Sequence, residues 1–382
     1  MGSQHVRILH VIDQLSVSSG VSNIVMGYVR NIDPNKFIID VAVYMTSDKK
    51  LIKEVEAKNG KVYQLPNISF PVASKYCREF AKVLADESYS VVHGHLPTAA
   101  FLFLKEAKIK GIPHRIIHAH SCGVDGFLKR LRNKGLIMLI PWYANHYAAC
   151  SNAAADYVYG KSAVGRVQIL LNAIDPDRFR FNAEKRIEIR KSLGIKGCDL
   201  CIGHVGRFAS IKNHMFLLDA FNELFQITHD VKLVLAGDGE LRDVIEQRIR
   251  KLNLGQAINV VGECDAVENL YQAFDQFWFP SFKEGWGVAG LEAQCAGLPC
   301  LFSENIPKEI NVLKKNVKFL SIDNPIGWAK AAQRLMKIER QDTTQAIYDC
   351  NLNISIQIKK LENSYEAMLQ SNNLFSVTSN KK

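Results

Sequence analysis

The sequence predicts an α/β protein built from two doubly wound parallel sheets. Short runs rich in β-branched residues alternate with amphipathic helical stretches, which is the pattern of parallel βαβ units with helices on both faces of a sheet. The alternation pauses in a charged, loop-like stretch, residues 176–197, which contains one expected helix, Glu184–Leu193, and it restarts near residue 200. The length of 382 residues suits two domains, at roughly 100 to 200 residues per domain.

The first half of the chain alternates strand and helix from its beginning. In each repeat, a run of strand length precedes a stretch with apolar residues at helical spacing. The expected elements, strand and helix in turn, are Val6–Ile12, Gly20–Ile32, Ile38–Tyr44, Leu51–Lys58, Lys61–Leu65, Tyr76–Glu87, Ser90–His93, Thr98–Lys110 and His114–His120.

The second half restarts the same order, which sets the domain boundaries. Its expected strands are Leu200–Val205, Val231–Ala236, Ile258–Val261 and Phe277–Phe279, and its expected helices are Asn213–Phe225, Leu241–Lys251 and Val288–Ala296. We expect an N-terminal domain (1–178), a linker (179–197), a C-terminal domain (198–350), a helix that can pack back on the N-terminal domain (351–370) and a disordered tail (371–382). Ligands of doubly wound folds bind at the carboxyl ends of the strands, so a deep cleft between the domains is the expected site.

Composition excludes two broad classes of protein. With 47% hydrophobic and 23% charged residues, the chain is too apolar to be largely disordered. Its longest uncharged apolar run, residues 135–144, has about half of the roughly 20 residues that a membrane-spanning helix needs. Nine cysteines without a repeating framework, behind an N-terminus unlike a signal peptide, indicate a reducing cytoplasm.

The net charge of +10 is concentrated in the first half of the chain. Residues 1–171 hold 21 Lys and Arg against 12 Asp and Glu. Such an excess indicates a local anionic partner, either a nucleic acid or an anionic membrane surface. A solvated basic face is the simpler alternative.

The segment 279–292 carries the most informative motif. A strand ends here, a turn with two glycines follows, and an apolar helix begins. Gly285 and Gly287 would let backbone amides approach a ligand, and the helix start would favour a diphosphate. Glu284 and Glu292 offer two carboxylates for the hydroxyls of a sugar and of a ribose. Alone, such a pair is in most cases structural: an acid at a helix start and a solvated charge on the helix.

Two more loops follow predicted strands of the C-terminal domain. In the segment 203–212, Gly206 precedes Arg207, and Lys212 follows five residues later. Arg supplies a planar fork and Lys a point charge, so both could meet a diphosphate. Gly237 opens a Gly-Asp-Gly turn that could pass close to a base or ribose, although such turns are common.

Gly20 and His120 are the candidates in the N-terminal domain. Gly20 lies at the first strand-to-helix turn, where it could bring amides near a phosphate or an acceptor, and a simple turn is equally consistent. His118 and His120 alternate along a strand and so face one side together. We interpret His120 as facing the substrate.

We expect no metal and no cofactor. His93 and His95 form a second pair like His118 and His120, but no further ligand stands near either pair in the sequence. The Asp-x-Asp pattern of residues 175–177 lies at the interdomain junction rather than at a strand end, and we interpret it as a turn. The Cys-x-x-Cys pattern of residues 198–201 has no second pair.

The ordered set of motifs resembles the retaining glycosyltransferases of family 4, which have the GT-B fold of two Rossmann-like domains. Order and spacing agree for the G-R-x4-K of Arg207 and Lys212, for the Gly-Asp-Gly turn, and for the E-x7-E of Glu284 and Glu292. Each motif is weak alone, and the set is highly specific. The resemblance covers about residues 6–370.

The first half of the chain resembles one branch of this family in particular. The sequences VVHGH, HAHS around His120 and LLNAID look like those of enzymes that build bacterial exopolysaccharide and capsule. One departure is Ser19, because the family usually has a pair of glycines in the loop that ends at Gly20.

The resemblance implies a role for each candidate residue. Arg207 and Lys212 would stabilise the leaving diphosphate of the donor, Glu284 would bind hydroxyls of the transferred sugar, Glu292 would bind the donor ribose, and His120 would lie near the sugar. The other donor-binding positions implied are Gly20, Gly206, Gly237, Gly285, Trp286 and Gly287.

The implied activity is transfer of a hexose-type sugar with retention of configuration and without a metal. A nucleotide sugar, preferably a UDP-sugar, would donate to a hydroxyl of a saccharide or lipid-linked saccharide in cell-surface polysaccharide biosynthesis. Two alternatives remain: a nucleotide-sugar epimerase with the GT-B fold, which would lack this motif combination, and a basic nucleic-acid-binding protein. No aromatic-basic interleaving supports the second, so we expect no nucleic acid partner.

A basic and apolar segment, residues 126–148, predicts where the enzyme works. Its cations beside long apolar side chains suit a surface that dips into an anionic leaflet, although a core helix with a basic face is the alternative. The cations are Lys129, Arg130, Arg132 and Lys134. With the lipid-linked acceptors of the family, this segment predicts a peripheral enzyme on the cytoplasmic face of the cell membrane, extending a saccharide carried on a polyprenyl diphosphate.

Overall fold

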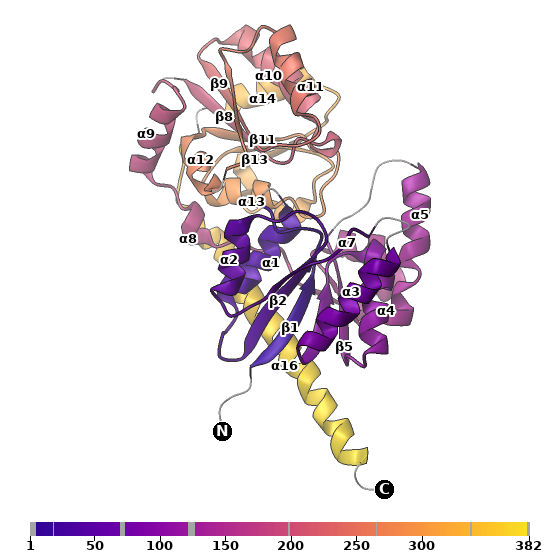
Figure 1. The fold of residues 1–382 in the computed structure, drawn as a ribbon. Coiled ribbons are helices and arrows are strands. Elements are labelled where there is room, and N and C mark those ends of the chain that lie inside the picture. Colours follow the sequence, from indigo (N-terminus) through magenta and orange to yellow (C-terminus); the bar gives the residue numbers. More distant parts are fainter. Residues whose placement is uncertain are drawn as a thin grey trace. The chain divides into compact units, whose positions relative to one another are not determined.

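The computed structural model describes residues 5–17, 19–68, 73–120, 127–197, 199–264, 266–336 and 338–379. The chain divides into two units, each built on one parallel sheet (Figure 1). The first unit comprises residues 1–172 and 354–382, and the second comprises residues 173–353. The predicted class, α/β with two Rossmann-like units, is confirmed.

The sheet of the first unit has seven parallel strands in the order β3-β2-β1-β4-β5-β6-β7. The strands are β1 (Val6–Val11), β2 (Phe37–Val43), β3 (Val62–Gln64), β4 (Tyr89–Gly94), β5 (His114–Ala119), β6 (His146–Ala149) and β7 (Val167–Ile169). The strand order reverses between β1 and β4, so the carboxyl ends of these two strands mark the switch point where doubly wound folds bind ligands.

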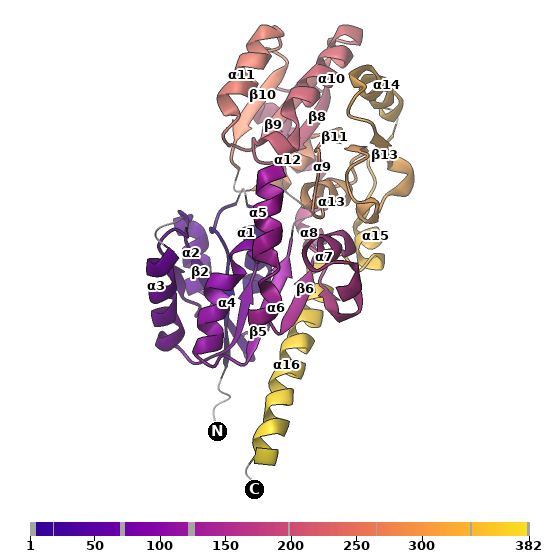
Figure 2. The ribbon, with the colours of Figure 1, turned by 90° about the vertical axis from the view of Figure 1, so that its right-hand side faces the viewer.

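Eight α-helices surround this sheet among the described residues. They are α1 (Gly20–Asn31), α2 (Lys49–Glu56), α3 (Ala73–Asp86), α4 (Ala100–Ile109), α5 (Phe127–Ile137), α6 (Ile140–Tyr143), α7 (Asn152–Tyr159) and α16 (Ile354–Ser379). Polar side chains begin several of them: Ser19, Asp48 and Ser151 each accept a hydrogen bond from an amide of the first turn. Figure 2 shows α3 and α4 side by side on one face of the sheet.

The C-terminal helix α16 completes the core of the first unit. Its Ile354, Ile358 and Leu361 are buried in one cluster with apolar residues of β1, β2 and α1. Glu362 accepts a hydrogen bond of 2.7 Å from the amide of Asp33, which fixes the helix beside the loop before β2. Figure 1 shows α16, in yellow, beside β1 and β2. Where the sequence predicted a disordered tail from residue 371, the helix continues to residue 379.

The sheet of the second unit has six parallel strands in the order β10-β9-β8-β11-β12-β13. The strands are β8 (Leu200–Val205), β9 (Val231–Ala236), β10 (Ile258–Gly262), β11 (Gln276–Phe279), β12 (Cys300–Ser303) and β13 (Val317–Leu320). The helices are α8 (Pro176–Phe179), α9 (Ala183–Ser192), α10 (His214–Ile227), α11 (Arg242–Lys251), α12 (Val267–Ala273), α13 (Val288–Cys295), α14 (Pro325–Leu335) and α15 (Thr344–Asp349).

Residues 179–197, predicted as a linker, belong to the second unit instead. In α9, Arg186 and Arg190 both pair with the carboxylate of Asp275, at 2.6 and 3.1 Å. Arg190 is almost fully buried and also donates to the carbonyl of Ala273. The charges that made this segment look like a solvated linker are therefore the groups that attach it to the unit.

Gly203 in β8 gives a test of this packing. A Cβ at position 203 would overlap the ring of Phe274, which is fully buried and has no space to move into. Gly203→Ala should therefore lower the free energy of unfolding by about 1–3 kcal/mol or more in a denaturant titration. Gly255→Ala is the matched control, because a Cβ there would meet nothing within 4 Å. Equal stability of the two variants would contradict the described packing of β8.

Candidate active site

Three loops singled out by the sequence meet at one edge of the second sheet. β8 lies between β9 and β11, and the three loops follow the carboxyl ends of these strands. The amide of Phe208 donates to the carbonyl of Asp238 at 2.9 Å, and the amide of Phe282 donates to the carbonyl of Ile211 at 2.8 Å. The loop after β8 thus contacts the loops after both neighbouring strands.

Two of the predicted glycines are required by backbone geometry. Gly237 has a φ of 141°, and a Cβ there would overlap the carbonyl of Gly206, so a side chain would separate the two loops. Gly287 has a φ of 90° and precedes the first residue of α13. Gly285 and Trp286 lie in the same loop as Gly287, and the indole of Trp286 is buried.

Lys212 and Glu284 form the central ion pair of this edge. Lys212 Nζ lies 2.7 Å from Glu284 Oε1, and both side chains are more than four-fifths buried. The ammonium also lies 4.9 Å from the centre of the Phe279 ring, a cation–π distance. The structure therefore brings together the Lys predicted to meet a diphosphate and the Glu predicted to meet a sugar, although they are 72 residues apart.

Arg207 lies in a different environment from Lys212. Its guanidinium pairs with Glu240 at 3.0 Å, and both side chains are more than half exposed. An exposed ion pair of this kind contributes little to stability, so the guanidinium can leave Glu240 for a stronger anion at small cost. The sequence predicted Arg207 and Lys212 as partners in one task, whereas in the structure each has its own carboxylate.

Glu292 in α13 is a carboxyl group held in an apolar setting. The hydroxyl of Tyr271 lies 2.8 Å from Glu292 Oε2 and donates to it. Burial raises the pKa of Glu292 to about 7, while Tyr271, Arg178 and Lys212 act in the lowering direction. A carboxyl group with this pKa exchanges its proton near neutral pH, and hydroxyl donors of a ligand would favour its ionised form.

Two buried histidines beside this edge were not identified from the sequence. His204 in β8 and His214 at the start of α10 are fully or almost fully buried, and burial lowers their pKa to about 4 and about 2. His204 Nδ1 donates to the carbonyl of Trp278 at 2.8 Å. These neutral imidazoles add no charge to the Lys212–Glu284 ion pair. A single histidine inside an apolar run carries no spacing signal by which to find it.

In the first unit, Gly20 is the first residue of α1 and is exposed. The Ser19 hydroxyl accepts a hydrogen bond of 3.3 Å from the amide of Ser22. The serine that departs from the family pattern therefore caps the helix. Ser18, in the same predicted turn, lies outside the described residues.

His120 belongs to a cluster of five histidines at the carboxyl ends of β1, β4 and β5. The cluster is His10, His93, His95, His118 and His120, with Tyr365 of α16 against it. His95 lies 2.8 Å from His120, and His93 lies 3.2 Å from His118. The sequence identified the two His-x-His pairs separately; the pairing of β4 with β5 brings them together.

Two triplets in this cluster have the residue type and proximity that a transition metal needs. They are His10, His93 and His95, and His95, His118 and His120, with ligand atoms within 4.8 Å of one another. The sequence shows no third ligand near the His93–His95 pair or the His118–His120 pair. In the structure, however, each pair has a further histidine close by. Asp175 and Asp177, by contrast, form a helix cap: Asp175 accepts from the amide of Asp177 at 3.1 Å.

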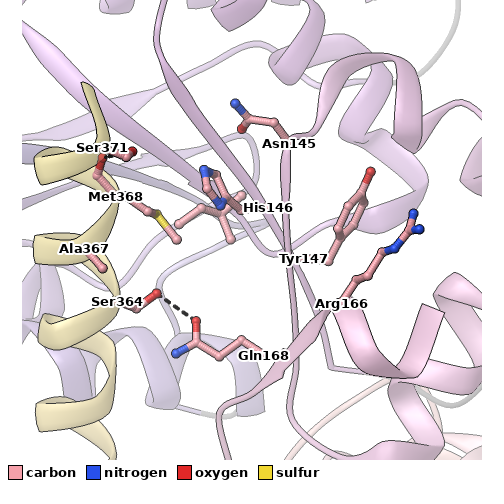
Figure 3. A pocket seen from close by; sticks show the side chains of 10 residues that line it. Asn145, His146, Tyr147, Arg166, Gln168, Ser364, Ala367, Met368 and Ser371 are labelled. Carbon is pink, nitrogen blue, oxygen red and sulfur yellow. Dashed lines mark hydrogen bonds between the residues drawn. The ribbon is translucent and has the colours of Figure 1, made fainter. Parts of the chain in front are cut away.

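A cavity of about 480 Å³ lies elsewhere in the first unit, between α16 and the last three strands (Figure 3). Its lining includes His146, the first residue of β6, and Ser364, whose hydroxyl donates to Gln168 at 2.8 Å. His146 is at the amino-terminal end of β6, whereas the histidine cluster lies at the carboxyl ends of β1, β4 and β5. The cavity is therefore separate from the candidate site.

Two family models match the chain and together span most of it. Residues 19–178 match "Glycosyltransferase Family 4", and residues 185–351 match "Glycosyl transferases group 1". The chain is 31% identical over 341 residues to the putative glycosyltransferase EpsF of Bacillus subtilis, covering 87% of this chain and 88% of that protein.

A second relative and a solved structure extend the comparison. The chain is 27% identical over 250 residues to the UDP-Gal:alpha-D-GlcNAc-diphosphoundecaprenol alpha-1,3-galactosyltransferase of Escherichia coli, covering 62% of this chain and 63% of that enzyme. The fold matches HepE of Anabaena, solved in complex with UDP and glucose, with a TM-score of 0.80 over 95% of this chain and 100% of HepE at 15% identity.

The raised pKa of Glu292 predicts how stability depends on pH. The unfolded chain ionises this carboxyl group at its ordinary pKa of 4.5, whereas the folded chain keeps the proton up to about pH 7. Between these values the folded state binds more protons, so the free energy of unfolding should fall as the pH rises, by on the order of 3 kcal/mol. Glu292→Gln keeps an acceptor for Tyr271 and should lack this fall. If the wild type and Glu292→Gln show parallel stability profiles in chemical denaturation between about pH 5 and pH 8, the raised pKa of Glu292 would be wrong.

Proposed function

Because this chain belongs to the glycosyltransferases of family 4 and has the GT-B fold, we propose that it transfers a sugar from a UDP-sugar, with retention, to a saccharide acceptor. The acceptor would be a saccharide or lipid-linked saccharide in cell-surface polysaccharide biosynthesis. The observation that carries the proposal is the Lys212–Glu284 pair at the carboxyl edge of the second sheet, beside the start of α13. It offers a cation for a diphosphate and a carboxylate for sugar hydroxyls in one place.

Lys212 and Arg207 would stabilise the leaving diphosphate. Negative charge develops on that group as the sugar departs, and preorganised cations lower the free energy of this state most effectively where water is excluded. Lys212 is more than four-fifths buried, and its exchange of Glu284 for phosphate oxygens would free the Glu284 carboxylate for the sugar. Arg207 can turn from the solvent-exposed Glu240 to the same anion.

Glu292 would bind the ribose of the donor. Vicinal hydroxyls present two donors, which an ionised carboxylate accepts better than a protonated one. The pKa of Glu292, about 7 because of burial, means that ribose binding would remove its proton near neutral pH. Glu292→Ala would then weaken nucleotide binding, and Glu284→Ala would impair sugar transfer more than nucleotide binding.

The donor and the metal requirement follow from separate observations. UDP is favoured because HepE was solved with UDP and because the related E. coli enzyme uses UDP-Gal. A metal-independent reaction is favoured because Asp175 and Asp177 are used as a helix cap and because Lys212 and Arg207 already supply positive charge. The leaving phosphate would take the proton of the acceptor hydroxyl.

The segment 127–148 is the basis for proposing an acceptor and a location of the enzyme in the cell. Four apolar side chains here are strongly exposed: Leu128 (78%), Leu131 (60%), Met138 (69%) and Trp142 (71%). The four cations Lys129, Arg130, Arg132 and Lys134 are exposed among them, whereas Gly126 lies outside the described residues. None of the described helices is long and apolar enough to span a bilayer. This surface suits peripheral binding to an anionic cytoplasmic leaflet, where a polyprenyl-diphosphate-linked acceptor would be extended.

Substitution of the cations tests the transfer site. Lys212→Ala and Arg207→Ala should each lower turnover of UDP-sugars on the order of a hundredfold, because each removes a charge from the departing diphosphate. Arg248→Ala is the control, since Arg248 forms an ion pair with Asp219 rather than with a strand-end loop. Turnover is measured with and without EDTA. Full activity of Lys212→Ala would contradict the proposed site. A loss of activity in EDTA that manganese restores would contradict a metal-independent reaction.

Flotation with vesicles tests the membrane surface. The wild-type protein should float with anionic vesicles at low salt and not with neutral ones, because each cation contributes roughly 1 kcal/mol near an anionic surface. Replacing Lys129, Arg130, Arg132 and Lys134 by Ser should abolish flotation. Replacing Lys49, Lys50, Lys53 and Lys58, four exposed cations on and after α2, by Ser changes the net charge equally and should not. Equal recovery of both quadruple variants would refute the assigned surface.

A further inference from the structure

The histidine cluster of the first unit is a continuous hydrogen-bonded chain of side chains. Starting at His118, the links are His118 Nδ1 to His93 Nε2 (3.2 Å) and His93 Nδ1 to the Tyr365 hydroxyl (2.7 Å). The hydroxyl then lies 3.2 Å from His10 Nε2, His10 Nδ1 lies 3.0 Å from His95 Nε2, and His95 Nδ1 lies 2.8 Å from His120 Nε2. We call these five histidines and Tyr365 the histidine chain.

The imidazoles of the histidine chain are uncharged at neutral pH. Burial lowers the pKa of His10 to about 3 and of His120 to about 4, and it holds the pKa values of the other three well below the ordinary 6.5. A neutral imidazole has one N–H donor and one bare nitrogen acceptor. Each ring of the chain can therefore donate only once and accept only once.

This restriction, together with a Tyr365 hydroxyl that donates to one ring, makes all five histidines share one tautomer. Each link within the chain joins an Nδ1 to an Nε2 or passes through the Tyr365 hydroxyl, which accepts from one ring and donates to the next. If one ring carries its proton on Nδ1, its neighbour must do the same for every link to be made. Three arrangements make all five links. In two of them every ring carries its proton on the same nitrogen, either Nδ1 or Nε2. In the third, the Tyr365 hydroxyl accepts from both His93 and His10, which leaves its own buried O–H without an acceptor and therefore costs free energy.

Asn172 selects between the two arrangements in which the rings share one tautomer. The two chain ends, His118 Nε2 and His120 Nδ1, are buried without a hydrogen-bond partner, and so is Asn172 Oδ1. Burial has the dominant effect on His120 and lowers its pKa, whereas the Asn172 side chain acts to raise it. An oxygen acceptor that faces a ring N–H has this raising effect. Because His120 Nε2 is already linked to His95, Nδ1 is the nitrogen that remains for Asn172. An amide oxygen facing Nδ1 would favour a proton on that nitrogen, and the chain would transmit this choice to the other four rings.

We propose that Tyr365 is a positioning residue of the active site: as the middle link, it joins His93 and His118 to His10, His95 and His120, and so helps to fix the His120 ring, whose Nδ1–H tautomer Asn172 selects, at the carboxyl edge of the sheet. The importance of the His120 ring for sugar transfer rests on the proposed function. The shared tautomer of the five rings does not depend on that function. In this arrangement His120 holds a fixed proton, so it does not act as the base that deprotonates the acceptor.

A metal ion would require a different protonation of the same residues. Both metal-type triplets contain His95, whose two nitrogens are already used in links of 3.0 and 2.8 Å. A metal at either triplet would break those links, because it needs a bare nitrogen from every ligand. The complete hydrogen-bonded chain and a metal at either triplet therefore exclude one another at His95.

Nitrogen NMR of histidine tests the shared tautomer directly. In the full-length protein labelled with ¹⁵N-histidine at pH 7, the five rings should all show the Nδ1–H pattern, assigned from single histidine substitutions. Mixed tautomers, a charged imidazolium among the five, or stoichiometric binding of Zn²⁺ that shifts His95, His118 and His120 would overturn the proposal. This measurement on the wild-type protein does not depend on any enzymatic activity.

Two substitutions test the transmission along the chain. Asn172→Leu removes the acceptor at one end, so an Nε2–H population should appear in all five rings together. Adding Tyr365→Phe cuts the middle link and should confine the change to His10, His95 and His120. A change limited to His120 in Asn172→Leu alone would show that the rings are not coupled.

The catalytic consequence is measured separately, with a neighbouring tyrosine as the control. Tyr365→Phe should lower kcat for sugar transfer on the order of tenfold, the equivalent of one neutral hydrogen bond. Tyr28→Phe should change neither the tautomers nor kcat, because Tyr28 lies against His10, with ring centres 6.0 Å apart, but forms no link of the chain. Unchanged kcat in a Tyr365→Phe protein with decoupled rings would overturn the positioning role while leaving the proposed function intact.

Discussion

Parallel pairing of β8 with β9 on one side and β11 on the other is the constraint on which the candidate active site depends. It places the ends of three strands at one edge, so that Lys212 and Glu284 meet at 2.7 Å despite their separation in sequence. Gly237 and Gly287 allow the loops to close on one another at this edge. The chemistry of the second unit is thus a product of strand order, with each loop contributing one or two groups.

The same constraint gathers a different set of groups in the first unit. There, β1, β4 and β5 end in histidines rather than in a cation and a carboxylate. Burial removes the charge of these rings, so their contribution is directional hydrogen bonding. One unit therefore presents charged groups at its carboxyl edge, and the other presents neutral hydrogen-bonding groups.

The two sheets and the motif loops could be predicted because strand alternation and loop spacing are local in sequence. Lys212 and Glu284 each belong to such a motif, although their ion pair is visible only in space. The role of α9 could not be predicted, since Arg190 reads as a surface charge until Asp275 is placed beside it. Tyr365 could not be predicted either, because a tyrosine in an amphipathic helix carries no sign of a partner 355 residues earlier.

The place of α16 in the chain makes completion of the first unit depend on synthesis of the second unit. Domains generally fold as units in the order in which they leave the ribosome, the N-terminal one first. Here the first unit needs Ile354, Ile358 and Leu361 for its core, and these residues emerge only after the whole second unit. We therefore expect the nascent first unit to keep part of its apolar core uncovered until α16, which follows the whole second unit, has been made.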